Sequence, residues 1–314
     1  MSSSETLDIK NYIGLTGDTP IRFIASDVDG TLVNEAKTVD PEVVDAVRVA
    51  RESGIRVAIA SGRAWHEMDD VIDAMPCLRY FVCTNGAYVM DKEEQKELVH
   101  ISFDKTRAMD LVRKLMTYGV FVEAYVKAEI FGQYPVVGNE TSQAEHFFRP
   151  NIRPFILKTR TMVLDLLAHL ESLSEGPEKI QIFYGDERIR ERILADLRDE
   201  FQGDATDGKG RERFYDVLES SEGNLEFVLP HTTKGTAVEA LANHWGYTPD
   251  EVMTIGDSEN DLSMIRFAGA SVAMGNARDN VKTVARYETT DNNHYGVAQA
   301  LYSAIAHNRE LETK

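Results

Sequence analysis

The sequence predicts an α/β fold, in which a parallel β-sheet core carries a second, α+β domain inserted into it. Near the N-terminus, apolar segments of strand length alternate with amphipathic helical segments, and the same alternation returns near the C-terminus. Between these regions the pattern changes to hairpin-like pairs of strands and helices. Strand–helix–strand repeats favour parallel pairing with right-handed crossovers, which gives a core resembling a Rossmann-like sheet.

The N-terminal half of the core follows from periodicity and from turn residues. Asp40 is a suitable N-cap, Pro41 suits the first helical turn, and Gly54 suits a helix end. Residues 1–19 are polar and are expected to form a weakly ordered lead. The elements expected after it are a strand over 21–25, a helix over 41–53, a strand over 56–60, a helix over about 64–75 and a strand over 80–83.

Periodicity and turn residues also predict the helices and strands in the rest of the chain. In the middle it predicts strands over 120–126, 128–134 and 179–184, a helix over 187–201, an exposed loop over 204–211 and a hairpin of 214–218 with 224–229. Near the C-terminus it predicts a helix over 235–245 capped by Thr233, a strand over 252–255, a short helix over 261–267, a strand over 270–273 and a helix over 295–306. The predicted domains are therefore a core of 20–88 with 230–314, and an insertion of 89–229.

Chemically active residues follow the predicted core strands. Asp27 and Asp29 come after the first strand, Ser61 and Gly62 after the second, and Asp257 after a C-terminal strand. Open parallel sheets bind ligands along the carboxyl ends of their strands, so these segments are expected to converge.

These residue types suit phosphoryl transfer. A carboxylate is an adequate nucleophile toward phosphorus when a divalent metal neutralises the phosphate, and a second carboxyl group can exchange protons with the leaving group and with water. Magnesium prefers hard oxygen ligands, which Asp27, a backbone carbonyl and Asp257 would supply, with Asp261 in a supporting position. Each segment alone also has an ordinary structural explanation, namely an acidic turn, a capped helix start or, for Lys234, a solvated charge.

Four motifs, in order, carry a resemblance to a known family. Asp27-Val28-Asp29-Gly30-Thr31, Ser61-Gly62-Arg63, Lys234-Gly235 and Gly256-Asp257-Ser258-Glu259-Asn260-Asp261 resemble the motifs of the haloacid dehalogenase-like superfamily of aspartate-nucleophile phosphatases. Thr84-Asn85-Gly86-Ala87 and Met274-Gly275-Asn276-Ala277 resemble its Cof-type branch, in which a cap domain is inserted between the second and third motifs.

The resemblance implies a role for each matching residue. Asp27 would form an aspartyl-phosphate, and Asp29 would act as general acid and base. The metal ligands would be Asp27, Asp29 through its backbone carbonyl, and Asp257, with Asp261 in support. The transferred phosphate would be held by Thr31, Ser61, Gly62, Lys234 and Asn260. Asn85 and Asn276 are assigned only as supports of their loops. Because Asp29 must be protonated in the first step, we expect neighbouring carboxylates to raise its pKa.

The first functional hypothesis is a magnesium-dependent phosphatase of small phosphorylated metabolites such as sugar phosphates. The alternative is a phosphomutase or phosphotransferase, in which an alcohol replaces water, and a non-catalytic binding protein would be expected to lack one of the site residues. The substrate cannot be read from the sequence. His146, Arg149 and Arg153, within the unusual stretch 138–154, either reach a polar substrate or are surface charges.

The composition restricts the classes of molecule that the protein is expected to bind. A formal net charge of −18 disfavours nucleic acid and anionic lipid, and the longest apolar runs are only of strand length. Two cysteines and the absence of a recognisable secretion signal favour a cytoplasmic protein, whose oligomeric state stays open.

Overall fold

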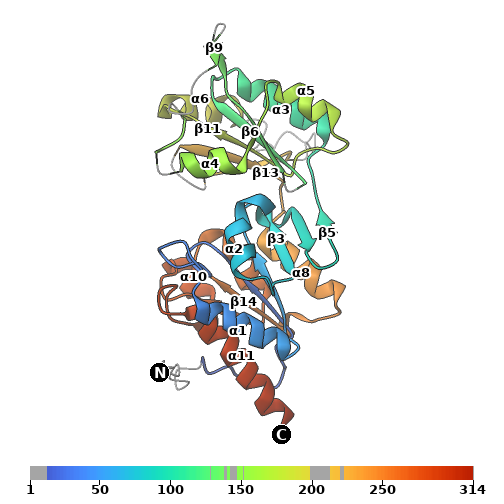
Figure 1. The fold of residues 1–314 in the computed structure, drawn as a ribbon, viewed down its shortest axis with the longest axis vertical. Coiled ribbons are helices and arrows are strands. Elements are labelled where there is room, and N and C mark those ends of the chain that lie inside the picture. The colour runs from blue at the N-terminus through green and yellow to red at the C-terminus, as the bar shows by residue number, and fades with distance from the viewer. Residues whose placement is uncertain are drawn as a thin grey trace. The chain divides into compact units, whose positions relative to one another are not determined.

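The computed structural model describes residues 13–127, 129–137, 140–141, 147–150, 152–198, 213–219 and 223–313. The described residues fall into two compact units (Figure 1). The first unit takes its residues from 1–63, 68–99 and 233–314, and the second from 64–67 and 100–232. Residues 1–12 of the predicted lead, the predicted loop over 204–211 and His146 lie outside the described residues.

The first unit is built on a largely parallel sheet. Its described strands, in order across the sheet, are β16 (Tyr287–Glu288), β15 (Ala270–Ala273), β14 (Val252–Gly256), β1 (Phe23–Ser26), β2 (Arg56–Ala60), β3 (Tyr80–Cys83), β4 (Tyr88–Asp91) and β5 (Lys96–His100). The strands from β16 to β3 pair in parallel, whereas β4 is antiparallel to β3. The prediction of an α/β fold with a parallel-sheet core is confirmed. Residues 88–99, most of which the sequence analysis assigned to the insertion, lie in the first unit and extend this sheet.

Helices cover the faces of this sheet. They are α1 (Pro41–Glu52), α2 (Asp69–Ala74), α8 (Lys234–His244), α9 (Leu262–Phe267), α10 (Asp279–Val284) and α11 (Gly296–Glu312), with the 3-10 helices η3 (Thr84–Gly86), η5 (Pro249–Glu251) and η6 (Glu259–Asp261). The 3-10 helix η2 (Trp65–Met68) belongs to the second unit except for Met68. The buried residues Val238 and Leu241 of α8 pack against Phe23 and Ala25 of β1. Helix α1 packs beside α11 (Figure 1). The predicted capping of α8 by Thr233 is confirmed, because the Thr233 side chain accepts a hydrogen bond from the Thr236 N–H.

The second unit is an antiparallel sheet with helices. Its described strands, in order, are β10 (Thr161–Met162), β7 (Glu129–Gln133), β6 (Phe121–Val126), β11 (Lys179–Phe183), β13 (Asn224–Val228) and β12 (Asp216–Leu218), with a separate hairpin of β8 (Val136–Val137) and β9 (Glu140–Thr141). Its described helices are α3 (Lys105–Met116), α4 (Arg153–Thr159), α5 (Leu166–Ser172) and α6 (Glu187–Asp196). Only β10 pairs in parallel among the described strand pairs of this sheet.

The two faces of the second sheet differ in chemistry because neighbouring strand residues point to opposite sides. Val122 and Ala124 of β6 join the apolar core beneath α3, α5 and α6. The alternate residues Glu123 and Tyr125 are also buried, and they are polar. A buried polar group costs free energy unless it is hydrogen-bonded, so this face must be paired internally.

A network centred on Arg160 provides that pairing. Its guanidinium donates to Glu123 at 3.0 Å (Nε–Oε2) and to the Tyr125 hydroxyl at 3.1 Å, and it lies 2.5 Å from the Glu67 carboxylate. All three charged side chains are at most 7% exposed. Burial by itself would lower the pKa of Arg160, but Glu123 and the other acidic neighbours raise it above its ordinary value. Arg160 therefore stays charged.

Candidate active site

The sheet brings three of the predicted motifs to one edge. In the parallel register Ser26 of β1 lies opposite Ile59 of β2 and Ile255 of β14. The residues that follow these strands, among them Asp27, Ser61 and Asp257, therefore emerge together. This convergence is the one expected from the strand order of an open parallel sheet.

Lys234 supplies a buried positive charge at this edge. Its Nζ donates to Asp27 Oδ1 at 2.6 Å and to Asp261 Oδ1 at 2.7 Å. The Lys234, Asp27 and Asp261 side chains are 1%, 5% and 0% exposed. Burial tends to lower the pKa of Lys234, but the charges of Asp261 and Asp27 outweigh it and raise this pKa above its ordinary value. The lysine is therefore a fixed cation rather than a solvated surface charge.

Asp261 is fully engaged by hydrogen bonds. Its Oδ1 accepts from Lys234, and its Oδ2 accepts from the backbone N–H groups of Asp257 and Ser258 at 3.0 Å each. Gly256 permits this arrangement, because a Cβ at that position would lie 2.6 Å from the Asp261 Cβ. Asp261 thus holds the loop that presents Asp257.

The acidic group has the donor chemistry of a cation site. Asp27, Asp257 and Asp261 each offer a carboxylate oxygen, and these oxygens lie within 4.8 Å of one another. Asp27 Oδ2 is buried and has no hydrogen-bond partner among the described residues. Burial and the Asp261 charge raise the pKa of Asp27 and the pKa of Asp257. Several carboxylates sharing one buried site need more positive charge than Lys234 gives, so the residues fit a divalent cation.

The loop after β1 is shaped around Asp257. Thr31 Oγ1 donates to Asp257 Oδ1 at 3.0 Å. Gly30 has a φ of +83°, and a Cβ there would lie 2.6 Å from Asp257 Oδ2. Asn276 Nδ2 donates to the Gly30 carbonyl at 2.8 Å, which fits its predicted part as a loop support. Thr31, predicted as a phosphate ligand, therefore directs its hydroxyl at Asp257 in this structure.

The expectation for the pKa of Asp29 is wrong. The Arg63 guanidinium donates two hydrogen bonds of 2.7 Å to the Asp29 carboxylate, and Lys37 Nζ donates to the same carboxylate at 3.1 Å. Burial tends to raise the pKa of Asp29, but the hydrogen bonds and charge of Arg63, aided by Lys37, lower it below its ordinary value. The expectation rested on acidic neighbours alone, whereas the charged groups that contact Asp29 are the cations of Arg63 and Lys37. The arginine of Ser61-Gly62-Arg63 was the available signal.

The remaining predicted phosphate ligands gather around Asn85. Asn260 Nδ2 donates to Asn85 Oδ1 at 3.4 Å. A Cβ on Gly62 would lie 3.1 Å from the same oxygen. Ser61 is 2% exposed, and its Oγ accepts from the Arg63 N–H at 3.1 Å. The structure therefore brings Ser61, Gly62 and Asn260 together.

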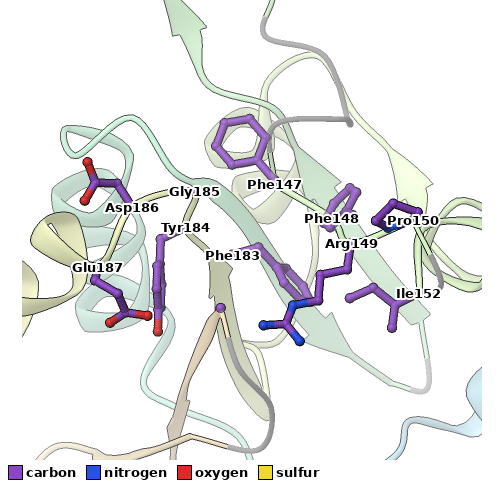
Figure 2. Close-up of a pocket in the computed structure, with 11 residues that line it drawn as sticks. Phe147, Phe148, Arg149, Pro150, Ile152, Phe183, Tyr184, Gly185, Asp186 and Glu187 are labelled. Carbon is purple, nitrogen blue, oxygen red and sulfur yellow. The ribbon is translucent and has the colours of Figure 1, made fainter.

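The second unit contains a pocket of its own, of about 410 Å³. Figure 2 shows aromatic side chains around it, including Phe147, Phe148 and Tyr184, together with Arg149. Arg149, expected to be either a substrate contact or a surface charge, is exposed and lines this pocket. Arg153 begins α4 and does not line it.

Comparison with known proteins identifies the family. Residues 24–301 match the family model described as haloacid dehalogenase-like hydrolase. The chain belongs to this family. It is 30% identical over 294 residues to the phosphatase YwpJ of Bacillus subtilis, covering 90% of this chain and 99% of that protein. The 5-amino-6-(5-phospho-D-ribitylamino)uracil phosphatase YcsE of the same organism is 28% identical over 288 residues, with 90% and 96% covered.

The solved structures agree with the sequence relatives. A haloacid dehalogenase-like hydrolase from Bacteroides thetaiotaomicron superposes with a TM-score of 0.74 at 26% identity, covering 90% of this chain and 98% of that one. The predicted resemblance to this family, and the prediction that the chain is a phosphoric monoester hydrolase, are confirmed. Among the described residues, none of the helices combines the length and apolarity needed to cross a membrane.

Proposed function

We propose that the chain is a magnesium-dependent phosphatase that hydrolyses small phosphorylated metabolites through an aspartyl-phosphate on Asp27. The main support for this proposal is the environment of the two Asp27 carboxylate oxygens. One oxygen is bound by Lys234 at 2.6 Å, while the other is buried without a partner among the described residues, beside Asp257. An unpartnered carboxylate oxygen next to a fixed cation suits attack on an anionic phosphate.

Asp27 and Asp257 would hold the magnesium ion, together with the backbone carbonyl of Asp29. When bound, the ion supplies positive charge that balances the transferred phosphoryl group. Asp261 keeps the Asp257 loop and Lys234 in place through the hydrogen bonds of both its oxygens. Phosphoryl transfer relies mainly on such positioning and charge balance.

The residues then act in two steps. An Asp27 oxygen bonds to phosphorus as the ester P–O bond breaks, and the departing alkoxide takes a proton from Asp29. A water molecule next gives its proton to Asp29 and attacks phosphorus, which releases inorganic phosphate and restores the Asp27 carboxylate. Ser61, Gly62, Lys234 and Asn260 are proposed to hold the phosphate oxygens during both steps.

Arg63 sets the protonation state of Asp29 in this scheme. The bidentate pair with Arg63 keeps Asp29 ionised at neutral pH, which is the form that accepts a proton from water. To donate a proton to the leaving group, Asp29 has to be protonated, and we infer that its hydrogen bonds to Arg63 and Lys37 loosen when the substrate binds.

The choice of substrate class draws on the relatives. YwpJ is named a phosphatase, and YcsE is named for a phosphorylated ribitylamino-uracil. Both names fit a small phosphate ester, and we propose sugar phosphates as the first class to assay. Selection among such esters is proposed to be a task of the second unit.

A panel of phosphate esters assayed for released phosphate, with and without magnesium, tests the proposal. Asp27→Asn keeps the size of the side chain and removes the nucleophile, so it should abolish turnover while circular dichroism stays unchanged. Retained turnover by the folded variant would refute the nucleophile. An isomerised ester without net phosphate release would indicate a mutase instead.

A further inference from the structure

The turn after β3 has an unusual backbone. Thr84 and Asn85 have φ values of +51° and +53°, and Gly86 follows at +105°. Left-handed conformations are unfavourable for residues with a Cβ, and two in succession persist only where surrounding contacts fix them. The conformation of η3 therefore depends on the groups that contact it.

The turn is fixed by two phosphate-site segments. The Thr84 N–H donates to the Arg63 carbonyl and the Asn85 N–H donates to the Ser61 carbonyl, both at 2.9 Å. On the other side, a Cβ on Gly86 would lie 2.3 Å from the Thr233 carbonyl oxygen. Thr233 is the N-cap of α8, the helix that Lys234 opens. The turn thus sits between the Ser61 segment and the start of α8.

The Asn85 side chain connects this turn to a further segment of the phosphate site, the one that contains Asn260. Its Oδ1 accepts from Asn260 Nδ2 at 3.4 Å, and the other end of the Asn260 amide, Oδ1, accepts from Ser258 Oγ at 2.7 Å. An amide nitrogen carries two hydrogens, so one N–H of Asn260 stays available for a phosphate oxygen. The Asn85 amide also lies against Gly62, where a Cβ would be 3.1 Å from Oδ1 and 3.3 Å from Nδ2.

We propose that Asn85 is a positioning residue of the phosphate site. Its side-chain amide orients the Asn260 amide and packs against the Ser61–Gly62 backbone, so that the Asn260 amide and this backbone face one phosphate group. The left-handed turn is what brings this side chain to that place. The proposal rests on the proposed function and assigns Asn85, expected from its motif only as a loop support, to the placement of the phosphate ligands.

Two substitutions distinguish the role of the Asn85 side chain from that of the left-handed backbone turn. Asn85→Gly removes the amide but adopts the left-handed conformation freely, so the turn is retained. Asn85→Asp keeps the shape and the acceptor for Asn260, but places a negative charge next to the anion. Gln95→Gly is the matched control, because Gln95 is exposed, has a φ of +52° and bonds to the Lys92 carbonyl in the β4–β5 turn.

The experiment is calorimetric titration of the full-length chain with inorganic phosphate in the presence of magnesium. We expect Asn85→Gly to weaken phosphate binding about fivefold to tenfold, the effect of losing one hydrogen bond. Asn85→Asp should weaken it further through charge repulsion, whereas Gln95→Gly should match the wild type. The KM for p-nitrophenyl phosphate should rise in parallel, with thermal unfolding of all variants close to that of the wild type.

The outcomes distinguish the two proposals. If the wild type binds phosphate and both Asn85 variants bind it equally well, the positioning role is wrong and the proposed function stands. An equal loss in Asn85→Asp and Asn85→Gly would show that position 85 does not face the anion, which also overturns the role. If the wild type binds no phosphate, the proposed function and the role of Asn85 fall together.

Discussion

Replacing Lys234 by methionine tests whether the buried cation holds the site together. The substitution keeps most of the side-chain volume but removes the ammonium that lies 2.6 Å from Asp27 and 2.7 Å from Asp261. Two carboxylates, 5% and 0% exposed, then lose their shared partner. Removing one partner of a buried ion pair costs about 3–5 kcal/mol, a large part of the roughly 5–15 kcal/mol that stabilises a typical protein.

The pH dependence has a definite sign. Burial lowers the pKa of Lys234, but Asp261 and Asp27 raise it above the ordinary 10.5, so its stabilising effect is fully present below pH 10.5 and is lost as the pH rises through the folded-state pKa. The pKa of Asp27 is already raised by burial and by Asp261, and it should rise further without the lysine. The deficit of the variant should therefore be largest near pH 8 and shrink toward pH 5, as the Asp27 carboxylate takes up a proton.

Urea unfolding followed by circular dichroism between pH 5 and 8, with EDTA present, measures this deficit. Lys282→Met is the control, because Lys282 forms a partly exposed pair with Glu288 at 2.8 Å and such pairs contribute about 0–1 kcal/mol. The reasoning is refuted if Lys234→Met costs no more than Lys282→Met, or if its deficit grows as the pH falls.

Three further predictions concern Arg63, Arg160 and the metal. Arg63→Met removes the guanidinium that lowers the pKa of Asp29, so the limb of the kcat–pH profile that Asp29 controls should move to higher pH; an unmoved profile contradicts this. Arg160→Met leaves the buried Glu123 without its cation and should cost about 3–5 kcal/mol in urea unfolding. The control Arg190→Met, which loses only the partly exposed pair with Glu219, should cost about 1 kcal/mol or less. Magnesium at about 100 times its Kd should add about 2.7 kcal/mol of stability in thermal unfolding, and an equal gain in Asp257→Asn would argue against the site.

The convergence of the motifs could be predicted because topology alone decides it. Parallel strands end at a common edge, so Asp27, Ser61 and Asp257 had to meet once β1, β2 and β14 were recognised as neighbours. Thr233 before Lys234 likewise placed the lysine at a helix start, since the capping pattern is local in sequence. Burial of Lys234 follows from its two carboxylate partners, which a local pattern cannot reveal.

Side-chain direction and backbone topology explain what sequence reasoning missed. The lowered pKa of Asp29 depends on Arg63 and Lys37 turning toward it, and nothing in their spacing requires this. The β4–β5 segment was assigned to the insertion because it is antiparallel in pattern, yet an antiparallel pair can extend the edge of a parallel sheet. The predicted helix over 64–75 is divided into η2 and α2 at Met68–Asp69, a break that its apolar spacing does not indicate.

The central claim is that Asp27 carries the phosphoryl group during turnover. Acid quenching of the working enzyme, followed by borohydride reduction and mass spectrometry of the peptides, tests it directly, because reduction converts an aspartyl-phosphate to homoserine. The account predicts homoserine at position 27 in a substrate-dependent amount. Homoserine at position 29 or 257 instead, or none at any position while phosphate is being released, would contradict it.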